Sequence, residues 1–138
     1  MTTLSDLDGT KWTGSCELWL DPLGNEAICS DATLSVEGQT VHYTWSHEGK
    51  DHQGRLTLTD DGLEFTDTWH QPEVMACPRI DGARGLFQAE GTYGPDNDWG
   101  WRLGVFSRTP SGELVVQMTN ITPWGEEARA VRIVGRPQ

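Results

Sequence analysis

The chain has 138 residues and a formal net charge of −11, and its carboxylates are spread along the whole sequence. It lacks the basic stripe that phosphate groups require, so we expect neither a nucleic-acid partner nor an anionic membrane partner. This length predicts one domain, residues 1–138, with a single hydrophobic core. Seven tryptophans are many for such a chain, and they are consistent with either a barrel core or an aromatic ligand cavity.

The N-terminal segment, MTTLSDLDGTKW, is acidic and has no apolar run, so we expect no signal peptide and no membrane span. The three cysteines are then expected to stay reduced thiols, which predicts a cytoplasmic protein. Residues Thr3–Leu7 predict one helical turn that lays Leu4 and Leu7 over an end of the core. Cys16 and Cys29 are expected to point to opposite faces of partner strands rather than form a disulfide.

Strands joined by tight turns follow, beginning with Thr10–Leu20. The Asp21–Asn25 turn sets Leu18 opposite Ile28, and the Thr59–Gly62 turn sets Gly54 opposite Asp67. Alternate residues share a face, and the resulting split is apolar on one side and polar on the other. On the two strands joined by the Thr59–Gly62 turn, the polar, outward face is predicted to include His70.

Two further turns complete the predicted register of the first half. A two-residue Glu37-Gly38 turn sets Ala32 opposite Tyr43. A Glu48–Asp51 loop sets Trp45 opposite Gly54 and His47 opposite His52. The inward face then gathers polar and aromatic side chains in its middle and at one end, which we interpret as a mouth: Trp45 and Asp67 in the middle, and His47, His52 and Trp69 at the end.

Residues Gln71–Ala83 show no periodicity and predict the longest loop, either a lid or an ordinary connection. The second half repeats the meander of short strands, and there is no amphipathic helix of useful length. Its inward positions are predicted to include Tyr93, Trp101, Met118, Asn120 and Arg129. Short strands at regular spacing predict an all-β fold, a closed antiparallel up-and-down barrel of about 8–10 strands.

The chain resembles the calycin superfamily, which includes lipocalins, fatty-acid-binding proteins and small bacterial lipocalin-like domains. The residues that carry the resemblance are Gly9-x-x-Trp12-x-Gly14 at the first strand, the strand meander, and Arg129 and Arg132 in the last strand. In that superfamily a first-strand tryptophan packs against a late arginine, which implies contact between Trp12 and Arg132. The resemblance implies a lipocalin-like barrel more strongly than it implies a particular function.

We expect the barrel to bind a small, partly apolar or aromatic molecule. Contact area would come from Tyr43, Trp45, Trp69, Tyr93, Trp101 and Met118, and the ligand would be oriented by His47, His52, Asp67, Asn120 and Arg129. The alternative is a cofactor-free enzyme, such as an isomerase, cyclase or lyase, that uses the same cavity. Asp67 would then be the general acid or base, assisted by His47, His52 or Tyr43.

Asp67 is the most informative of these residues, because a buried, unpaired carboxylate is costly. Either Arg129 neutralises it in a structural network, or burial raises its pKa and prepares it for proton transfer. His47 and His52 would need a third metal ligand, such as Asp67 or Glu48. Histidines at a rim are more commonly solvated or hydrogen-bonded, so no metal is expected. No glycine loop cradles a phosphate, and no histidine follows His70 to match the late haem ligand of haem-binding barrels, so no cofactor is expected.

Three apolar residues, Phe106, Val115 and Ile121, are expected on the outer wall of the second half. Exposed together, they predict a homodimer contact; the alternative is that another part of the chain covers them.

Overall fold

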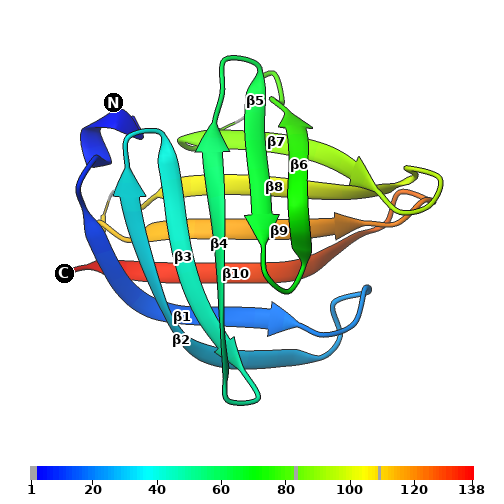
Figure 1. The fold of residues 1–138 in the computed structure, drawn as a ribbon, viewed down its shortest axis with the longest axis horizontal. Coiled ribbons are helices and arrows are strands. Elements are labelled where there is room, and N and C mark those ends of the chain that lie inside the picture. Colours follow the sequence, from blue (N-terminus) through cyan, green and yellow to red (C-terminus); the bar gives the residue numbers. More distant parts are fainter. Residues whose placement is uncertain (1–2, 83, 109) are drawn as a thin grey trace.

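The computed structural model describes residues 3–82, 84–108 and 110–138, and in these ranges it contains ten antiparallel strands and one 3-10 turn (Figure 1). The strands form one sheet with the order β6-β5-β4-β3-β2-β1-β10-β9-β8-β7. The bounds are η1 Ser5–Leu7, β1 Lys11–Trp19, β2 Ala27–Glu37, β3 Thr40–His47, β4 Lys50–Leu58, β5 Gly62–Asp67, β6 Gln71–Pro78, β7 Phe87–Tyr93, β8 Trp99–Ser107, β9 Leu114–Ile121 and β10 Glu127–Pro137.

The sheet curls into a nearly closed up-and-down barrel, as the strand pattern predicts. Its two end strands, β6 and β7, meet through a single bridge between Arg79 and Ala89 and through a hydrogen bond from Ile80 N to Gln88 O at 3.1 Å. A continuous ladder therefore runs through the other nine strand pairs, while the β6–β7 seam is closed only near one end.

Two of the four predicted hairpin registers are confirmed. Leu18 lies opposite Ile28 in the β1–β2 pair, and Gly54 lies opposite Asp67 in the β4–β5 pair. Cys16 is buried and Cys29 is exposed, so the two thiols lie on opposite faces as expected. In both hairpins the alternation of apolar and polar residues extends to the turn and leaves one pairing that buries the apolar set.

The predicted registers of β2–β3 and β3–β4 are wrong by two residues. Tyr43 pairs with Leu34 and Gly54, and Trp45 pairs with His52. The β3–β4 connection is a two-residue turn in which Glu48 and Gly49 have φ values of 51° and 75°. Such positive values at both positions define the tight hairpin turn whose twist matches that of the strands. A shift of two residues preserves which face each side chain occupies, so the inward set is correct although its layers are not.

The segment predicted as a long loop is a strand over most of its length. Gln71–Pro78 forms β6 and pairs with β5, with Met75 opposite Phe65 and Cys77 opposite Leu63. Both of its inward sulfur-bearing side chains are buried. Pro72 and Pro78 hide the strand character in the sequence, yet proline is compatible with the edge of a sheet. Ala83, the last residue of the predicted loop, lies outside the described residues.

One end of the barrel is a dry core. Leu4, which precedes η1, is buried against this core, and Leu7 is half-buried against it. Trp12 is buried nearby and donates its indole N–H to Thr10 Oγ1 at 3.0 Å. The predicted helical turn and its role as a cover are therefore confirmed. The apolar side chains that fill this end include Leu34, Val36, Val41, Leu56, Leu63, Val105, Leu114, Val116 and Ile133.

Arg129 does not point into the barrel, contrary to the prediction. A β-bulge between Arg129 and Val131 breaks the alternation of β10 and leaves Arg129 exposed while Val131 is buried. The Arg129 guanidinium instead lies 4.9 Å from the ring centroid of Trp19 and donates a hydrogen bond to Gly24 O at 3.3 Å. Arg129 is therefore not the partner of Asp67.

The expected contact between Trp12 and Arg132 is also absent from the described structure. Trp12 lies opposite Pro137 on β10, whereas Arg132 lies opposite Glu17 and faces the outer wall. The first-strand tryptophan closes the dry end through packing and its bond to Thr10.

The outer patch expected at Phe106, Val115 and Ile121 is not exposed as a unit. Val115 is only 3% exposed and lies between its cross-strand neighbours Phe106 and Val134. Phe106 and Ile121 are half-buried. In the described ranges, no helix has the length and apolar character needed to cross a bilayer.

Candidate functional site

Asp67 ends β5 and is the most deeply buried charged residue described, at 1% exposure. Its Oδ2 accepts hydrogen bonds from the Tyr43 hydroxyl and from Trp45 Nε1, the latter at 3.3 Å. Its Oδ1 accepts from the backbone N–H groups of Trp69 and His70, at 2.8 and 2.9 Å. Four donors thus surround one carboxylate, and two of them shape the turn that leads from β5 into β6.

The opposing strand makes room for this network with a glycine. Gly54 pairs with both Tyr43 and Asp67. A Cβ atom at Gly54 would lie 2.2 Å from the Tyr43 hydroxyl oxygen and 2.3 Å from Cζ. The Tyr43 ring therefore lies across the glycine, which lets its hydroxyl reach Asp67.

His70 is the partner of Asp67 that the alternation pattern missed. The pattern places it on the outer face, but its side chain is only 13% exposed and its Nδ1 lies 3.3 Å from Asp67 Oδ1. The turn after Asp67 interrupts the strand, so parity no longer predicts facing. The imidazole is enclosed by indoles, with ring centroids 4.7 Å from Trp69, 5.7 Å from Trp45 and 5.5 Å from Trp101.

The pKa of Asp67 is lowered to about 2, in contrast to the alternative in which burial raises it. Burial by itself would raise this pKa. The adjacent His70 side chain lowers it through hydrogen bonding and through its charge, and hydrogen bonds from the Tyr43 hydroxyl and the His70 backbone N–H lower it further, so that together these effects outweigh burial. Burial, together with the adjacent carboxylate, raises the pKa of Tyr43 well above its usual value. The carboxylate therefore stays ionised, and the phenol that donates to it stays protonated.

This shift predicts a loss of stability in acid. The pKa of Asp67 is lower in the folded state, so its contribution is complete above the unfolded value of 3.8 and disappears as the pH falls toward 2. We expect about 2 kcal/mol to be lost between pH 5 and pH 2 from this residue. Urea unfolding of the wild type and of Asp67→Asn between pH 5 and pH 2 measures this loss of stability, because the variant lacks the titrating carboxylate. Parallel pH profiles for the two proteins would contradict the prediction.

A cavity of about 140 Å³ lies beside His70. Its lining residues belong to the β5–β6 hairpin and to β7 and β8, and Figure 1 shows this hairpin in front of those two strands. Phe65 and Trp101, which both line it, are stacked with ring centroids 6.2 Å apart and an interplanar angle of 21°. Its lining is aromatic and apolar with a few polar groups: Phe65, His70, Gln71, Met75, Tyr93 and Trp101.

Some of the predicted ligand-contact residues line this cavity, and others lie elsewhere. Tyr93 and Trp101 line it, and Asn120 accepts a hydrogen bond from the Tyr93 hydroxyl at its edge. Tyr43, Trp45 and Asp67 lie behind His70 and hold it in place. Met118 is completely buried in the core and does not line the cavity. Sequence reasoning missed His70, Gln71 and Met75 as site residues because it placed them on the outer face or in a loop.

His47, His52 and Trp69 form a second cluster, outside the cavity. The His52 ring stacks on Trp45 at 4.5 Å, and Trp69 packs edge-on against Trp45 and is 40% exposed. His47 lies opposite Lys50 rather than His52. In the described ranges no three His, Cys, Asp or Glu side chains are grouped closely enough to hold a metal ion.

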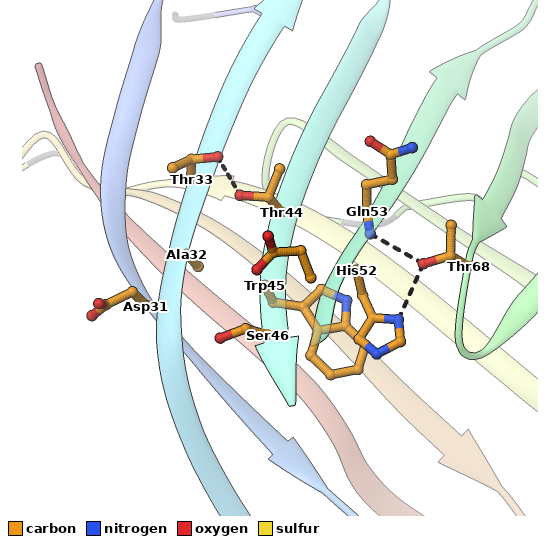
Figure 2. Close-up of a pocket in the computed structure, with 10 residues that line it drawn as sticks. Asp31, Ala32, Thr33, Thr44, Trp45, Ser46, His52, Gln53 and Thr68 are labelled. Atoms are coloured by element: carbon orange, nitrogen blue, oxygen red, sulfur yellow. Dashed lines mark hydrogen bonds between the residues drawn. The ribbon is translucent and has the colours of Figure 1, made fainter. Parts of the chain in front are cut away.

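An open groove of about 840 Å³ lies beside this cluster and is lined mostly by residues of β2, β3 and β4 (Figure 2). The β2–β3 ladder ends at the Thr33–Thr44 pair, whose hydroxyls lie 2.5 Å apart, and beyond it the strands separate. Figure 2 shows Trp45 and His52 stacked at this opening, with Thr68 bonded to the His52 ring and to the Gln53 backbone. The groove is lined mainly by hydroxyl, amide and carboxylate groups, in contrast to the aromatic cavity.

Comparison of the chain with protein-family models, with curated proteins and with solved structures found no match in any of the three sets.

Proposed function

We propose that this protein binds a small, apolar or aromatic molecule in the cavity beside His70. The observation that carries the proposal is the composition of the cavity wall: two stacked aromatic rings and a methionine, next to one imidazole held by a buried carboxylate. Binding sites for small molecules combine apolar surface with a few fixed polar groups in this way. A nearly closed barrel supplies a rigid frame for such a site, and its strand order is compatible with a calycin-like fold.

The size of the cavity selects small ligands. A volume of about 140 Å³ is close to that of an apolar protein cavity known to accommodate benzene, about 150 Å³. It is below the range of about 300–1,000 Å³ that is usual for drug-sized ligands. The ligand we propose is therefore a single ring or a molecule of similar bulk, rather than a fatty acid.

The alternative of an enzyme in which Asp67 exchanges protons with a substrate has weaker support. All four hydrogen-bond donors around Asp67 come from the chain itself, and the carboxylate has a lowered pKa. A general acid or base needs the opposite: a pKa near the working pH and access to the substrate. Asp67 instead supports the proposed ligand site by positioning His70.

Toluene is the simplest probe of this proposal. We expect it to bind with a Kd of about 0.1–1 mM, which is within the affinity that seven heavy atoms can provide. Ligand-observed NMR gives the Kd, and a shift of the Trp101 indole N–H resonance, assigned by its loss in Trp101→Phe, locates the site.

Two variants on β6 provide a matched comparison. Met75→Trp adds an indole to the cavity wall and should weaken toluene binding at least ten-fold, whereas Val74→Trp adds the same group at an exposed position and should not. Circular dichroism checks that both variants fold. Absence of toluene binding to the wild type, or equal binding to both variants with no shift at Trp101, would refute the proposed site.

A further inference from the structure

A pocket of about 190 Å³ lies at the bulge in β10. It spans three neighbouring strands, because β10 lies between β1 and β9 in the sheet, as Figure 1 shows. Glu17, which lines it, alternates with the buried residues Cys16 and Leu18, and this places the pocket on the outer side of the sheet. Its polar and aromatic lining residues are Glu17 and Trp19 on β1, Gln117 and Thr119 on β9, and Arg129 and Arg132 on β10. None of them lines the aromatic cavity beside His70, so the two sites are separate.

The bulge brings the two arginines of this pocket to the same face. Arg129 and Arg132 are three positions apart, a spacing that puts residues on opposite faces of a regular strand. Their partners on β9, Thr119 and Gln117, are two positions apart and therefore share a face. The extra residue that the bulge inserts makes up the difference, so both guanidinium groups project on the same side as the two β9 side chains. Two like charges in one pocket repel each other, which favours an anion between them.

Arg132 has no acceptor in the part of the chain that the structure describes. Its side chain is half-buried and lies opposite Glu17, yet the ion pairs found in the described ranges involve neither residue. Its Nε atom is enclosed and unpaired, whereas its two Nη atoms, which have no partner there either, are not enclosed. A ligand in the pocket can therefore bond to the Nη atoms, which form the outer edge of the guanidinium fork.

Arg129 is held in a fixed position with most of its donors free. Its Cζ atom lies 4.9 Å from the centroid of the Trp19 ring, and its Nη2 donates to Gly24 O at 3.3 Å. This long bond uses only one of the several N–H groups of the guanidinium. Trp19 is buried beneath the arginine although it lies on the outer side of β1, so the indole keeps the guanidinium in place. Donors that are already positioned lose little freedom when a ligand binds.

The charges of the lining select the class of ligand. Two guanidinium groups and the Glu17 carboxylate give the pocket a formal charge of +1. A carboxylate carries one negative charge, and its two oxygens match the planar guanidinium fork. A doubly charged phosphate would leave the pocket negative. We propose that this pocket binds a small organic carboxylate, held between Arg129 and Arg132 with the Gln117 amide and the Thr119 hydroxyl as further donors.

Benzoate and benzamide test the proposal, since they have nearly the same shape and differ in charge. In a buffer free of carboxylates and phosphate, benzoate should bind with a Kd of about 1 mM, and benzamide about ten-fold more weakly. Ligand-observed NMR gives both values, and a shift of the Trp19 indole N–H resonance, assigned by its loss in Trp19→Phe, locates the site. Equal binding of the two compounds, or tighter binding of phosphate than of benzoate, would overturn the carboxylate assignment.

Variants distinguish this pocket from other parts of the surface and from the aromatic cavity. Arg129→Gln and Arg132→Gln each remove one charge and should weaken benzoate binding about ten-fold, whereas Arg136→Gln, on the same strand but outside the pocket, should not. Met75→Trp narrows the aromatic cavity and should leave benzoate binding unchanged. Circular dichroism checks that each variant folds. If Arg132→Gln binds benzoate as tightly as the wild type, or if Met75→Trp no longer binds it, the inference fails while the proposed function stands.

Discussion

Replacing Asp67 with alanine is expected to lower the free energy of unfolding by about 3–5 kcal/mol, a large share of the stability of a domain of this size. The variant would leave the Tyr43 hydroxyl and the Trp45 indole N–H buried without an acceptor, because both bond only to Asp67 Oδ2. It would also remove the acceptor of the two backbone N–H groups that form the β5–β6 turn. Each orphaned buried donor has its own desolvation cost.

Urea unfolding followed by circular dichroism measures this effect. Asp67→Asn keeps the shape and one acceptor oxygen, so it should be destabilised less than Asp67→Ala. Asp61→Ala removes an exposed carboxylate from the β4–β5 turn and should change the free energy of unfolding by less than about 0.5 kcal/mol. A value within about 1 kcal/mol of the wild type for Asp67→Ala would show that the network contributes little.

The second large effect is expected at Gly14, the last residue of the Gly-x-x-Trp-x-Gly pattern. A Cβ atom there would lie 1.8 Å from the carbonyl oxygen of Val134 and 2.8 Å from its carbonyl carbon. The obstacle is backbone rather than a flexible side chain, and β1 is paired on both sides, with β2 and with β10. Gly14→Ala must therefore separate two strands in the middle of the sheet.

We expect Gly14→Ala to lower the free energy of unfolding by about 3 kcal/mol or more, the upper part of the range for overpacked sites. Ser15→Ala, at the next and exposed position of the same strand, is the control and should be nearly neutral. Thermal and urea unfolding of the two variants provide the comparison. If Gly14→Ala unfolds like Ser15→Ala, β1 has freedom to move that the described packing excludes.

Gly14 also shows what the family resemblance can and cannot indicate. A glycine is required at position 14 because β10 approaches β1 closely there, and this close approach is a property of the barrel. The tryptophan of the same pattern, Trp12, packs in the dry end but lies opposite Pro137 rather than Arg132, the partner that the resemblance implies. The pattern therefore supports the fold, while the site depends on other residues.

The alternation of apolar and polar residues was sufficient to predict an all-β barrel, its dry end and most inward positions, because a side-chain period of two is local. Tyr43, Trp45 and Asp67 were correctly placed inside on this basis, and Tyr93 and Trp101 line the cavity described above. Turn residues predicted the register only where the turn type allowed one pairing. At Glu48-Gly49, a two-residue turn with positive φ at both positions shifted every pair of β3–β4 by two residues.

Only the tertiary structure decided where the alternation breaks, and those breaks determine the site. The bulge in β10 turned Arg129 outward, and the turn held by Asp67 brought His70 inward. The bulge is an irregularity in the pairing of β10 with β9, and the turn is held by hydrogen bonds from the Trp69 and His70 N–H groups to Asp67 Oδ1; a side-chain period of two encodes neither. The cavity likewise exists because the β5–β6 hairpin stands beside β7 and β8 with little backbone pairing between β6 and β7, a consequence of how the sheet closes.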